Sequence, residues 1–375
     1  MRLLYVVNVD WFFISHRLPI AIEAQKKNFE VHLALEVTSH KKFLENHGFK
    51  VHPIKIKRGK FSFFYDTILF LKLINIFLKI KPNIVHLVTI KAIIFGGIIS
   101  KILKIKSVVY SVAGLGFVFV DKGLYSSIRK YLVKNLYKLA FNNKQKKIIF
   151  QNYEDKLFLT RLANLNLSET ILIPGSGVDL TKFNMSILPK GKLNFLMASR
   201  MIKEKGVWEF VEAAKIINQK FKHVKFTIAG SVDHENPSSL KDEDLRKIDK
   251  NKFINVLGEQ KEMNKIIQQS HVVVLPSYYG EGVPKILIEA AACGRAIITT
   301  DTPGCRDTIN PDSSGLLIPS KDINALVKAI EKIILSPNKI FNMGVQSRKL
   351  AESKFSIRYV VKKHLDIYVS LGALR

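Results

Sequence analysis

The chain has 375 residues, of which 47% are hydrophobic, 12 are proline and 20 are glycine. This composition excludes intrinsic disorder and fibrous repeats, and the length is typical of two domains. Lys and Arg total 59 against 31 Asp and Glu, so the formal charge is +28. Such a charge indicates an acidic partner, namely a nucleic acid, a membrane surface or a phosphorylated substrate. Compositional drift toward lysine is the alternative explanation.

The cysteines and the amino terminus indicate a cytoplasmic protein. Cys293 and Cys305 are too few for a disulfide framework and lack the spacing of a zinc site. Residues 3–7 form an apolar run that is too short for a secretion signal, and no small-residue cleavage site follows it. No stretch reaches the ~18 uninterrupted apolar residues of a membrane-spanning helix, so we expect none.

In the first half of the chain, short apolar runs alternate with longer amphipathic segments. The runs predicted to be buried strands are residues 3–7, 31–35, 84–87, 107–112 and 148–150. A helix is predicted over residues 18–27, with Pro19 tolerated in its first turn. This alternation favours a parallel, doubly wound sheet, because parallel neighbours need crossover helices.

A turn-rich segment at residues 173–179 precedes a second alternation of the same kind. The strands predicted there are residues 194–198, 225–229, 254–257, 272–276, 296–300 and 315–318. The helices predicted there are residues 207–219, 263–270, 284–293 and 323–335. We therefore expect an α/β fold of two doubly wound, Rossmann-like domains, residues 1–175 and 176–355, with ligands at the carboxyl ends of the strands. Residues 356–375 should add a helix that packs back on the first domain.

The most informative segment is residues 272–289, VVVLPSYYGEGVPKILIE, which predicts a buried strand, a glycine-flanked loop and a helix starting near Pro284. The free backbone N–H groups of Gly282 and Val283 at the helix start form a ready anion site. Glu281 lies in the loop, and Glu289 follows eight positions later. A carboxylate beside an anion site requires a ligand that also offers hydroxyl donors. A nucleotide sugar has both features.

These residues resemble the retaining glycosyltransferases of family 4, which have the GT-B fold of two Rossmann-like domains facing an interdomain cleft. Glu281 and Glu289 match the family's E-x7-E motif, and residues 200–206, RMIKEKG, match R-x4-K-G. Residues 173–183, IPGSGVDLTKF, are similar to the interdomain signature. The resemblance extends over nearly the whole chain and is most specific between residues 194 and 320.

The basic pair of the second motif has a clear chemical use. A departing nucleoside diphosphate gains negative charge, which Arg200 and Lys205 can neutralise without a metal ion. The resemblance implies that Glu281 contacts the transferred sugar and Glu289 the ribose. It also implies that Gly258 lies by the nucleobase. We expect neither a bound metal nor a cofactor.

The first domain should bind the acceptor. Its loop at residues 8–17 lacks the double glycine of many family members but is similar, through SHRLP at 15–19, to a subgroup that builds capsule, O-antigen and lipid-linked oligosaccharides. That subgroup includes bacterial N-acetylgalactosaminyltransferases acting on undecaprenyl-diphosphate sugars. His16, Arg17, His86 and Lys91 are the candidate acceptor contacts, although His86 ends a predicted strand and a satisfied, half-buried histidine is the alternative there. Ala113 stands in the region where many relatives carry a histidine.

Two basic segments, residues 55–81 and 128–147, mix lysines with aromatic or aliphatic residues at helical spacing. Such amphipathic segments lie in the interface of anionic membranes, although an ordinary helix with a solvated basic face has the same pattern. We therefore expect a cytoplasmic enzyme that is peripheral on the inner face of the cell membrane.

We predict a retaining, metal-independent glycosyltransferase that moves a hexose or N-acetylhexosamine from a UDP-sugar to a polyprenyl-diphosphate-linked glycan in the assembly of surface polysaccharide or glycoprotein glycans. A GT-B UDP-sugar epimerase or an enzyme with a soluble acceptor would share the motifs. Asp242 and Asp244 have the D-x-D spacing of metal-dependent transferases, but a solvated helix start explains them better. Residues 8–13 lack the glycines of a dinucleotide-binding turn. Nucleic-acid binding, the non-enzyme alternative, rests on charge alone.

Overall fold

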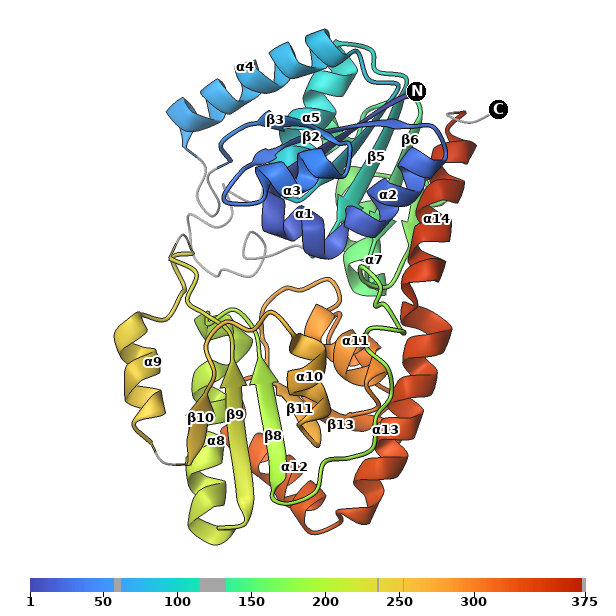
Figure 1. The fold of residues 1–375 in the computed structure, drawn as a ribbon. Helices are drawn as coiled ribbons and strands as arrows, with labels where there is room; N and C mark the ends of the chain where they lie inside the picture. Colours follow the sequence, from blue (N-terminus) through green and yellow to red (C-terminus); the bar gives the residue numbers. More distant parts are fainter. Residues whose placement is uncertain (57–61, 115–132, 235, 252, 373–375) are drawn as a thin grey trace. The chain divides into compact units, whose positions relative to one another are not determined.

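The computed structural model describes residues 1–56, 62–114, 133–234, 236–251 and 253–372, and it divides into two compact units. Unit 1 comprises residues 1–176 together with the chain from residue 357 onward, and unit 2 comprises Gly177–Ser356. Each unit is built around one parallel sheet with helices on both faces (Figure 1). The α/β, doubly wound fold class predicted from the sequence is confirmed.

The sheet of unit 1 has seven strands in the order β3-β2-β1-β4-β5-β6-β7. Their bounds are β1 Arg2–Val9, β2 Glu30–Glu36, β3 Lys50–Pro53, β4 Ile84–Val88, β5 Ser107–Val112, β6 Lys146–Phe150 and β7 Thr170–Leu172. Every pairing is parallel, so all carboxyl ends meet at one edge. The strand order reverses between β1 and β4, and such a switch point is where ligands bind in open α/β sheets.

Alternate residues of β1 enter the two cores of unit 1, as the period of a strand requires. Tyr5 and Val7 pack with helices α1 (Asp10–His16), α2 (Leu18–Lys26) and α14 (Ile357–Ser370). Leu4 and Val6 pack with α4 (Phe63–Ile80) and α5 (Ile90–Ile102) on the other face. Unit 1 also contains α3 (Lys41–Asn46), α7 (Tyr153–Ala163) and a helical segment at residues 133–140.

The sheet of unit 2 has six strands in the order β10-β9-β8-β11-β12-β13. Their bounds are β8 Leu193–Ala198, β9 Val224–Ala229, β10 Ile254–Val256, β11 Val272–Leu275, β12 Ala296–Thr300 and β13 Gly315–Ile318. The helices are α8 Val207–Lys220, α9 Asp242–Asp249, α10 Met263–Gln268, α11 Lys285–Ala292, α12 Ile323–Ile334 and α13 Asn338–Leu350. Here the strand order reverses between β8 and β11.

The sequence missed β3 and β7, which have four and three residues and are too short to give a recognisable apolar run. The prediction of one amphipathic segment over 128–147 was wrong at its end, because Lys146 and Lys147 lie in β6. Lys146 pairs with Glu169, and Lys147 donates to the carbonyl of Ser168. Residues 128–132 of that segment lie outside the described residues. Across the described part of the chain, every helix is too short or too polar to span a bilayer.

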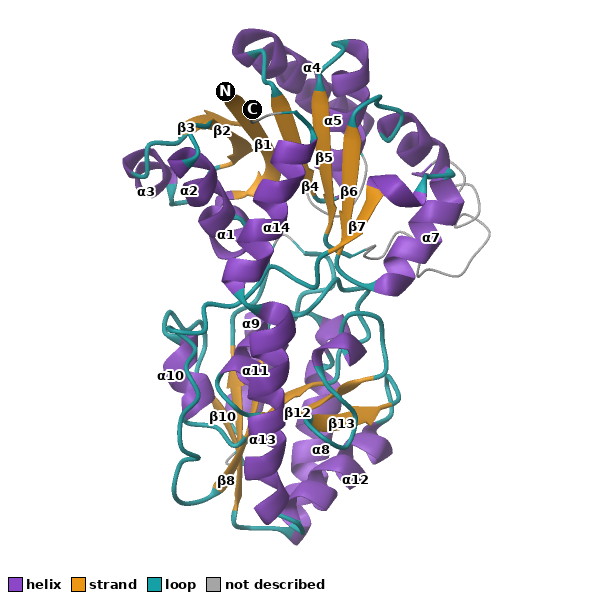
Figure 2. Ribbon diagram, turned by 90° about the vertical axis from the view of Figure 1, so that its right-hand side faces the viewer, coloured by secondary structure: helices purple, strands orange, loops and turns teal. Residues whose placement is uncertain are grey.

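Helix α14 lies against the sheet of unit 1 (Figure 2), and a buried polar network fastens it there. The Tyr368 hydroxyl lies 2.7 Å from the Tyr5 hydroxyl and 2.7 Å from Nδ1 of His86. Nε2 of His86 lies 2.7 Å from the Ser111 hydroxyl. Near the end of the helix, the hydroxyl of Ser107 donates to the carbonyl of Leu371 at 3.0 Å. Residues more than 250 positions apart in the sequence thus share one core.

Tyr368→Phe should lower the free energy of unfolding by about 2 kcal/mol, because it leaves buried groups of Tyr5 and His86 without their shared partner. Tyr359→Phe, on the exposed side of the same helix, is the matched control and should change stability by less than about 0.5 kcal/mol. Urea unfolding followed by circular dichroism measures both. Equal effects of the two substitutions would show that the network does not stabilise α14.

Candidate active site

The carboxyl edge of the unit 2 sheet gathers polar residues from the loops after β8 and β11. Arg200 follows β8, and a short 3-10 turn, Lys203–Lys205, leads into α8. Glu281 lies in the loop between β11 and α11. Because β8 and β11 are neighbours across the switch point, these loops meet at the place where a doubly wound sheet binds its ligand.

Glu281 is held at both carboxylate oxygens. Nζ of Lys205 lies 2.5 Å from Oε2, and the Ser277 hydroxyl donates to Oε1 at 2.7 Å. Both members of the ion pair are largely buried, so water screens their attraction only weakly. The structure thus brings together two residues that stand 76 positions apart in the sequence.

Ser277 also links the Glu281 loop to the turn before α8. Its hydroxyl lies 3.2 Å from the carbonyl oxygen of Glu204, and the backbone N–H of Tyr278 donates to the same oxygen at 2.9 Å. Gly206 follows that turn with a φ of +80°, and a Cβ there would overlap the carbonyl of Pro276. Only glycine therefore lets the two loops approach this closely.

Arg200 makes a different contact on the same edge. Its Nη1 lies 2.7 Å from Oδ2 of Asp233, a residue in the segment after β9. The guanidinium is more than one third exposed, whereas the Asp233 carboxylate is mostly buried. Sequence reasoning missed Asp233 and Ser277. Their positions in the sequence could have identified them, because each residue follows a strand whose carboxyl end lies at the ligand-binding edge.

The second glutamate of the motif has an altered pKa. Glu289 lies in α11 and is 8% exposed, and this burial raises the pKa of its carboxyl to about 7. Lys285 opposes the rise only weakly, with its Nζ 3.9 Å from Oε1. Pro284 caps α11, and Gly282 and Val283 immediately precede it, as the sequence predicts for a helix start facing an anion.

Gly258 follows β10 with a φ of +65°, and its carbonyl accepts a hydrogen bond from the N–H of Gly230 at 2.7 Å. No atom lies within 4 Å of a Cβ built there, so its surroundings are open. The glycine ends a strand at the same edge as Arg200 and Glu281.

In unit 1, the corresponding edge is organised by Asp10, which is fully buried after β1. Its carboxylate accepts hydrogen bonds from the backbone N–H groups of Thr38, Ser39 and His40, which fix the loop after β2. Burial opposes ionisation, yet the hydrogen bonds from Thr38, His40 and Trp11 hold the pKa of Asp10 below its usual value. Sequence analysis did not single out this residue.

Lys91 does not present a solvent-facing ammonium to an acceptor, contrary to expectation. It is 7% exposed, and its Nζ lies 2.7 Å from Oδ1 of Asp66 in the first turn of α4. Just before it, the hydroxyl of Thr89 donates to the side chain of Asn8 at 2.5 Å across the switch point between β4 and β1. The ion pair therefore ties the start of α4 to the carboxyl edge.

His86 was expected to end a strand, but it lies in the middle of β4 and is fully buried. Both ring nitrogens contact hydroxyl groups in the polar network of α14, so no nitrogen remains for an acceptor. Burial holds its pKa well below the usual value. Ala113 directly follows β5, so this position supplies no imidazole.

His16 and Arg17 lie between α1 and α2. The half-buried imidazole of His16 stacks on Phe12 with ring centroids 4.1 Å apart. Arg17 is 2% exposed; its Nη1 donates to the carbonyl of His16, and its Nε has no hydrogen-bond partner among the residues that the structure describes. Burial lowers the pKa of this guanidinium. Among the described residues, no group of three His, Cys, Asp or Glu side chains could hold a metal ion.

Known proteins match both units. Residues 2–152 match the family model "Glycosyl transferase 4-like", and residues 180–350 match "Glycosyl transferases group 1". A capsular polysaccharide biosynthesis glycosyltransferase of Staphylococcus aureus is 30% identical, over 92% of this chain and 90% of the relative. An N,N'-diacetylbacillosaminyl-diphospho-undecaprenol alpha-1,3-N-acetylgalactosaminyltransferase of Campylobacter jejuni is 25% identical over 98% of both chains.

Solved structures show the same fold. Anabaena HepE, in a complex with UDP and glucose, aligns with a TM-score of 0.77 at 16% identity and covers 99% of this chain and 100% of its own. Sucrose-phosphate synthase from Thermosynechococcus elongatus aligns with a TM-score of 0.78 at 18% identity, over 100% of this chain and 99% of its own. The matches over both units, together with the arrangement at the carboxyl edge, show that this chain is a glycosyltransferase and belongs to the GT-B glycosyltransferases of family 4.

Proposed function

We propose that this glycosyltransferase moves a hexose or N-acetylhexosamine from a UDP-sugar to a polyprenyl-diphosphate-linked glycan, with retention and without a metal ion. The observation that carries the proposal is the buried pair of Lys205 and Glu281 at the switch point of unit 2. The pair places a cation for a diphosphate beside a carboxylate for sugar hydroxyls. The UDP complex of Anabaena HepE supports the choice of donor.

In this proposal the charges at the carboxyl edge stabilise the leaving group. As the glycosidic bond to UDP breaks, negative charge grows on the diphosphate. Lys205, Arg200 and the N–H groups before α11 offset that charge, which is the work that a metal ion does in other transferases. Glu281 orients the sugar and Glu289 binds the ribose. The leaving diphosphate itself accepts the proton of the attacking hydroxyl, on the same face of the sugar, and the configuration is thereby retained.

The relatives support a lipid-linked acceptor. The Campylobacter jejuni enzyme acts on a diphospho-undecaprenol sugar, and an Escherichia coli enzyme, 28% identical over 78% of this chain, acts on GlcNAc-diphosphoundecaprenol. His16 remains the candidate for a direct contact at the acceptor edge, since its imidazole is only half-buried. Such an acceptor places the enzyme at the cytoplasmic face of the cell membrane.

Helix α4 is the surface that we propose for membrane contact. It buries one apolar face, including Leu73 and Phe77, and exposes a second one. Phe63 is 92% exposed, and the other large exposed side chains of this helix are Phe64, Tyr65, Ile68, Leu71 and Leu78. Lysines 72 and 79 lie among them. An exposed aromatic and basic face of this kind suits the interface of an anionic bilayer.

Glu281→Gln should lower turnover by about 10²-fold, the cost of losing one preorganised polar contact in the transition state. Release of UDP from a panel of UDP-sugars, with a short glycan-diphosphate acceptor, measures the effect. Glu243→Gln, on the exposed side of α9, is the control for removing a carboxylate and should retain full turnover.

The same assay in EDTA tests the metal-independent mechanism, because the wild type should keep its activity there. Activity that is lost in EDTA and restored by Mg²⁺ or Mn²⁺ would contradict it. If Glu281→Gln kept a turnover near that of the wild type, Glu281 would not have the role assigned to it.

The raised pKa of Glu289 makes donor binding pH-dependent. Ribose hydroxyls donate to the ionised carboxylate, which predominates above pH 7 and is protonated below it. The Kd of UDP should therefore rise about tenfold between pH 8 and pH 6 if only the ionised form binds. In Glu289→Gln the part of this dependence that comes from the protein should vanish, while the titration of UDP itself remains. Calorimetric titrations of both proteins with UDP distinguish the two contributions, and identical pH profiles would contradict the proposal.

Phe63→Ser/Phe64→Ser should weaken binding to anionic liposomes by about tenfold or more without changing turnover on a short, water-soluble acceptor. The apolar contact of α4 is then lost while the active site stays intact. Leu335→Ser, a 72% exposed leucine outside α4, is the matched control. Liposome flotation at two salt concentrations also tests the lysines, because salt screens their attraction to anionic lipid. Equal flotation of both variants would show that α4 is not the membrane surface.

A further inference from the structure

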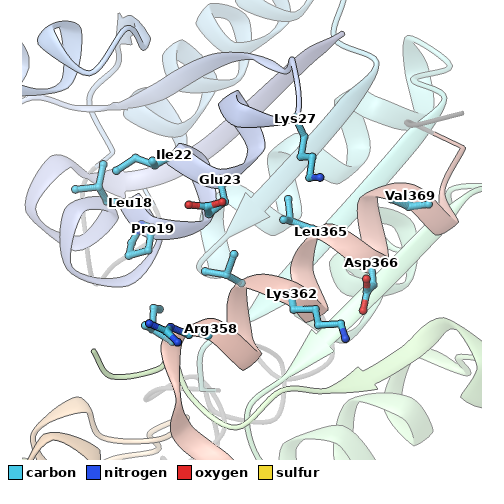
Figure 3. A pocket seen from close by; sticks show the side chains of 12 residues that line it. Leu18, Pro19, Ile22, Glu23, Lys27, Arg358, Lys362, Leu365, Asp366 and Val369 are labelled. Atoms are coloured by element: carbon cyan, nitrogen blue, oxygen red, sulfur yellow. The ribbon is translucent and has the colours of Figure 1, made fainter. Parts of the chain in front are cut away.

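Two features of unit 1 do not enter the chemistry described above, and the first is a groove. It has a volume of about 800 Å³ and runs between α2 and α14 (Figure 3). Aliphatic side chains line it together with charged ones, namely Glu23, Lys27, Arg358, Lys362 and Asp366. Both walls thus carry acidic and basic groups, and the groove does not distinguish a ligand by its charge.

The second feature is an irregular stretch of backbone at the carboxyl end of β1. Between Val6 and Val9, this strand has one residue more than the stretch of β2 with which it pairs. Such a β-bulge commonly lies next to an active site, where it redirects a side chain. Val7 stays in the core, whereas Asn8 is partly exposed. The bulge therefore places a polar side chain at the carboxyl edge directly after a buried apolar run.

Thr89, which directly follows β4, has a strained backbone. Its φ is +80° and its ψ is 159°, a combination that essentially only glycine adopts. In the described part of the chain, the other non-glycine residues with positive φ have values from 47° to 62°, close to the left-handed helical region, and none of them is β-branched. Strain of this kind persists only where the surrounding structure enforces it, and it is concentrated at functional sites.

A hydrogen bond joins the two irregular positions. The hydroxyl of Thr89 donates to Oδ1 of Asn8 at 2.5 Å, which directs the other end of the amide away from Thr89. Nδ2 of Asn8 has no hydrogen-bond partner among the residues that the structure describes. The charged neighbours on this edge are already engaged, because Lys91 pairs with Asp66 and the carboxylate of Asp10 binds the loop after β2. The Asn8 amide is thus held with two N–H donors available to a ligand.

We propose that Asn8 binds an oxygen of the acceptor sugar through its amide N–H groups, and that Thr89 is the residue that positions this amide. The inference rests on the proposed function in placing the acceptor at the carboxyl edge of unit 1, since Lys205 and Glu281, the groups assigned to the donor, lie in unit 2. A neutral amide suits a hydroxyl or acyl oxygen of a sugar, whereas a diphosphate binds best beside an unpaired cation. Glycine would fit the backbone at position 89 without strain, so the hydroxyl is what threonine adds there.

The test uses the full-length protein with a panel of acceptors, namely glucose, galactose, GlcNAc and GalNAc, each as a methyl glycoside and as a farnesyl-diphosphate ester. Asn8→Ala and Thr89→Gly should each raise the KM of the best acceptor about tenfold, through the loss of one hydrogen bond to the ligand, and leave the KM of the UDP-sugar unchanged. Thr89→Ser keeps the hydroxyl and should raise the acceptor KM about twofold at most. Asn28→Gly, which also replaces a residue with positive φ in unit 1, is the matched control and should change neither KM.

Two further measurements separate positioning from a structural role. Thr89→Gly should not lower the midpoint of urea unfolding, because glycine adopts this backbone without strain. If Thr89 acts through Asn8, the double variant Asn8→Ala/Thr89→Gly should have the acceptor KM of Asn8→Ala alone.

Several results would overturn the inference. These are an unchanged acceptor KM in Asn8→Ala, an equal rise in the KM of the UDP-sugar, effects of the two substitutions that multiply, or a urea midpoint that falls in Thr89→Gly. Transfer to the methyl glycosides alone would refute only the lipid-linked acceptor of the proposed function, and the comparison of the variants would still stand. If the wild type transferred to none of these acceptors, the proposed function would fail, and calorimetric titration of the same variants with the methyl glycosides and UDP would replace the kinetic test. Equal affinities of wild type and Asn8→Ala, or no binding by the wild type, would then overturn the inference as well.

Discussion

The ion pair between Lys205 and Glu281 is the contact on which the proposed donor site depends. It joins the 3-10 turn after β8, which carries Lys205, to the irregular loop after β11, which carries Glu281. Removing one member of a buried pair leaves an uncompensated charge, which costs about 3–5 kcal/mol. Burial removes water from both Lys205 and Glu281. A ligand with an anionic group and hydroxyl groups can contact the two side chains and compensate for that loss. The pair therefore holds in place the two charged groups that, in the proposed function, contact a nucleotide sugar.

Ser277 helps to hold the Glu281 carboxylate of this pair in position. Its hydroxyl donates to the oxygen of Glu281 that Lys205 does not contact. Its own carbonyl accepts from the hydroxyls of Thr300, the last residue of β12, and Thr302, which follows that strand. Three neighbouring strands thus determine the orientation of one carboxylate. Such preorganisation favours a transition state, because the polar groups need no rearrangement when charge develops. Unit 1 has a similar arrangement at Asp10, whose buried carboxylate accepts hydrogen bonds from a neighbouring loop and so fixes that loop.

The sequence predicted the buried strands and the Lys205 and Glu281 motifs because both leave local signals, namely apolar runs and glycine-flanked loops. It missed β3 and β7, which are short and sit at sheet edges where little apolar surface is buried. It also gave no sign of the buried partners of His86 and Lys91. Their partners, Tyr368 and Asp66, lie 282 and 25 positions away, and no local pattern encodes such a pairing. A polar residue beside a strand looks the same in the sequence whether it faces a ligand or a buried partner.

The return of α14 to unit 1 has a consequence for biosynthesis. Unit 2 is continuous in sequence, so it can fold as soon as residue 356 has left the ribosome. Unit 1 cannot be completed at that stage, because the hydroxyl of Tyr5 forms its hydrogen bond with Tyr368, which lies 363 positions later in the sequence. Until the last helix is synthesised, the aliphatic face of the first sheet and the Arg17 guanidinium beneath it stay exposed to solvent. The completion of unit 1 therefore depends on a helix that is synthesised after the whole of unit 2.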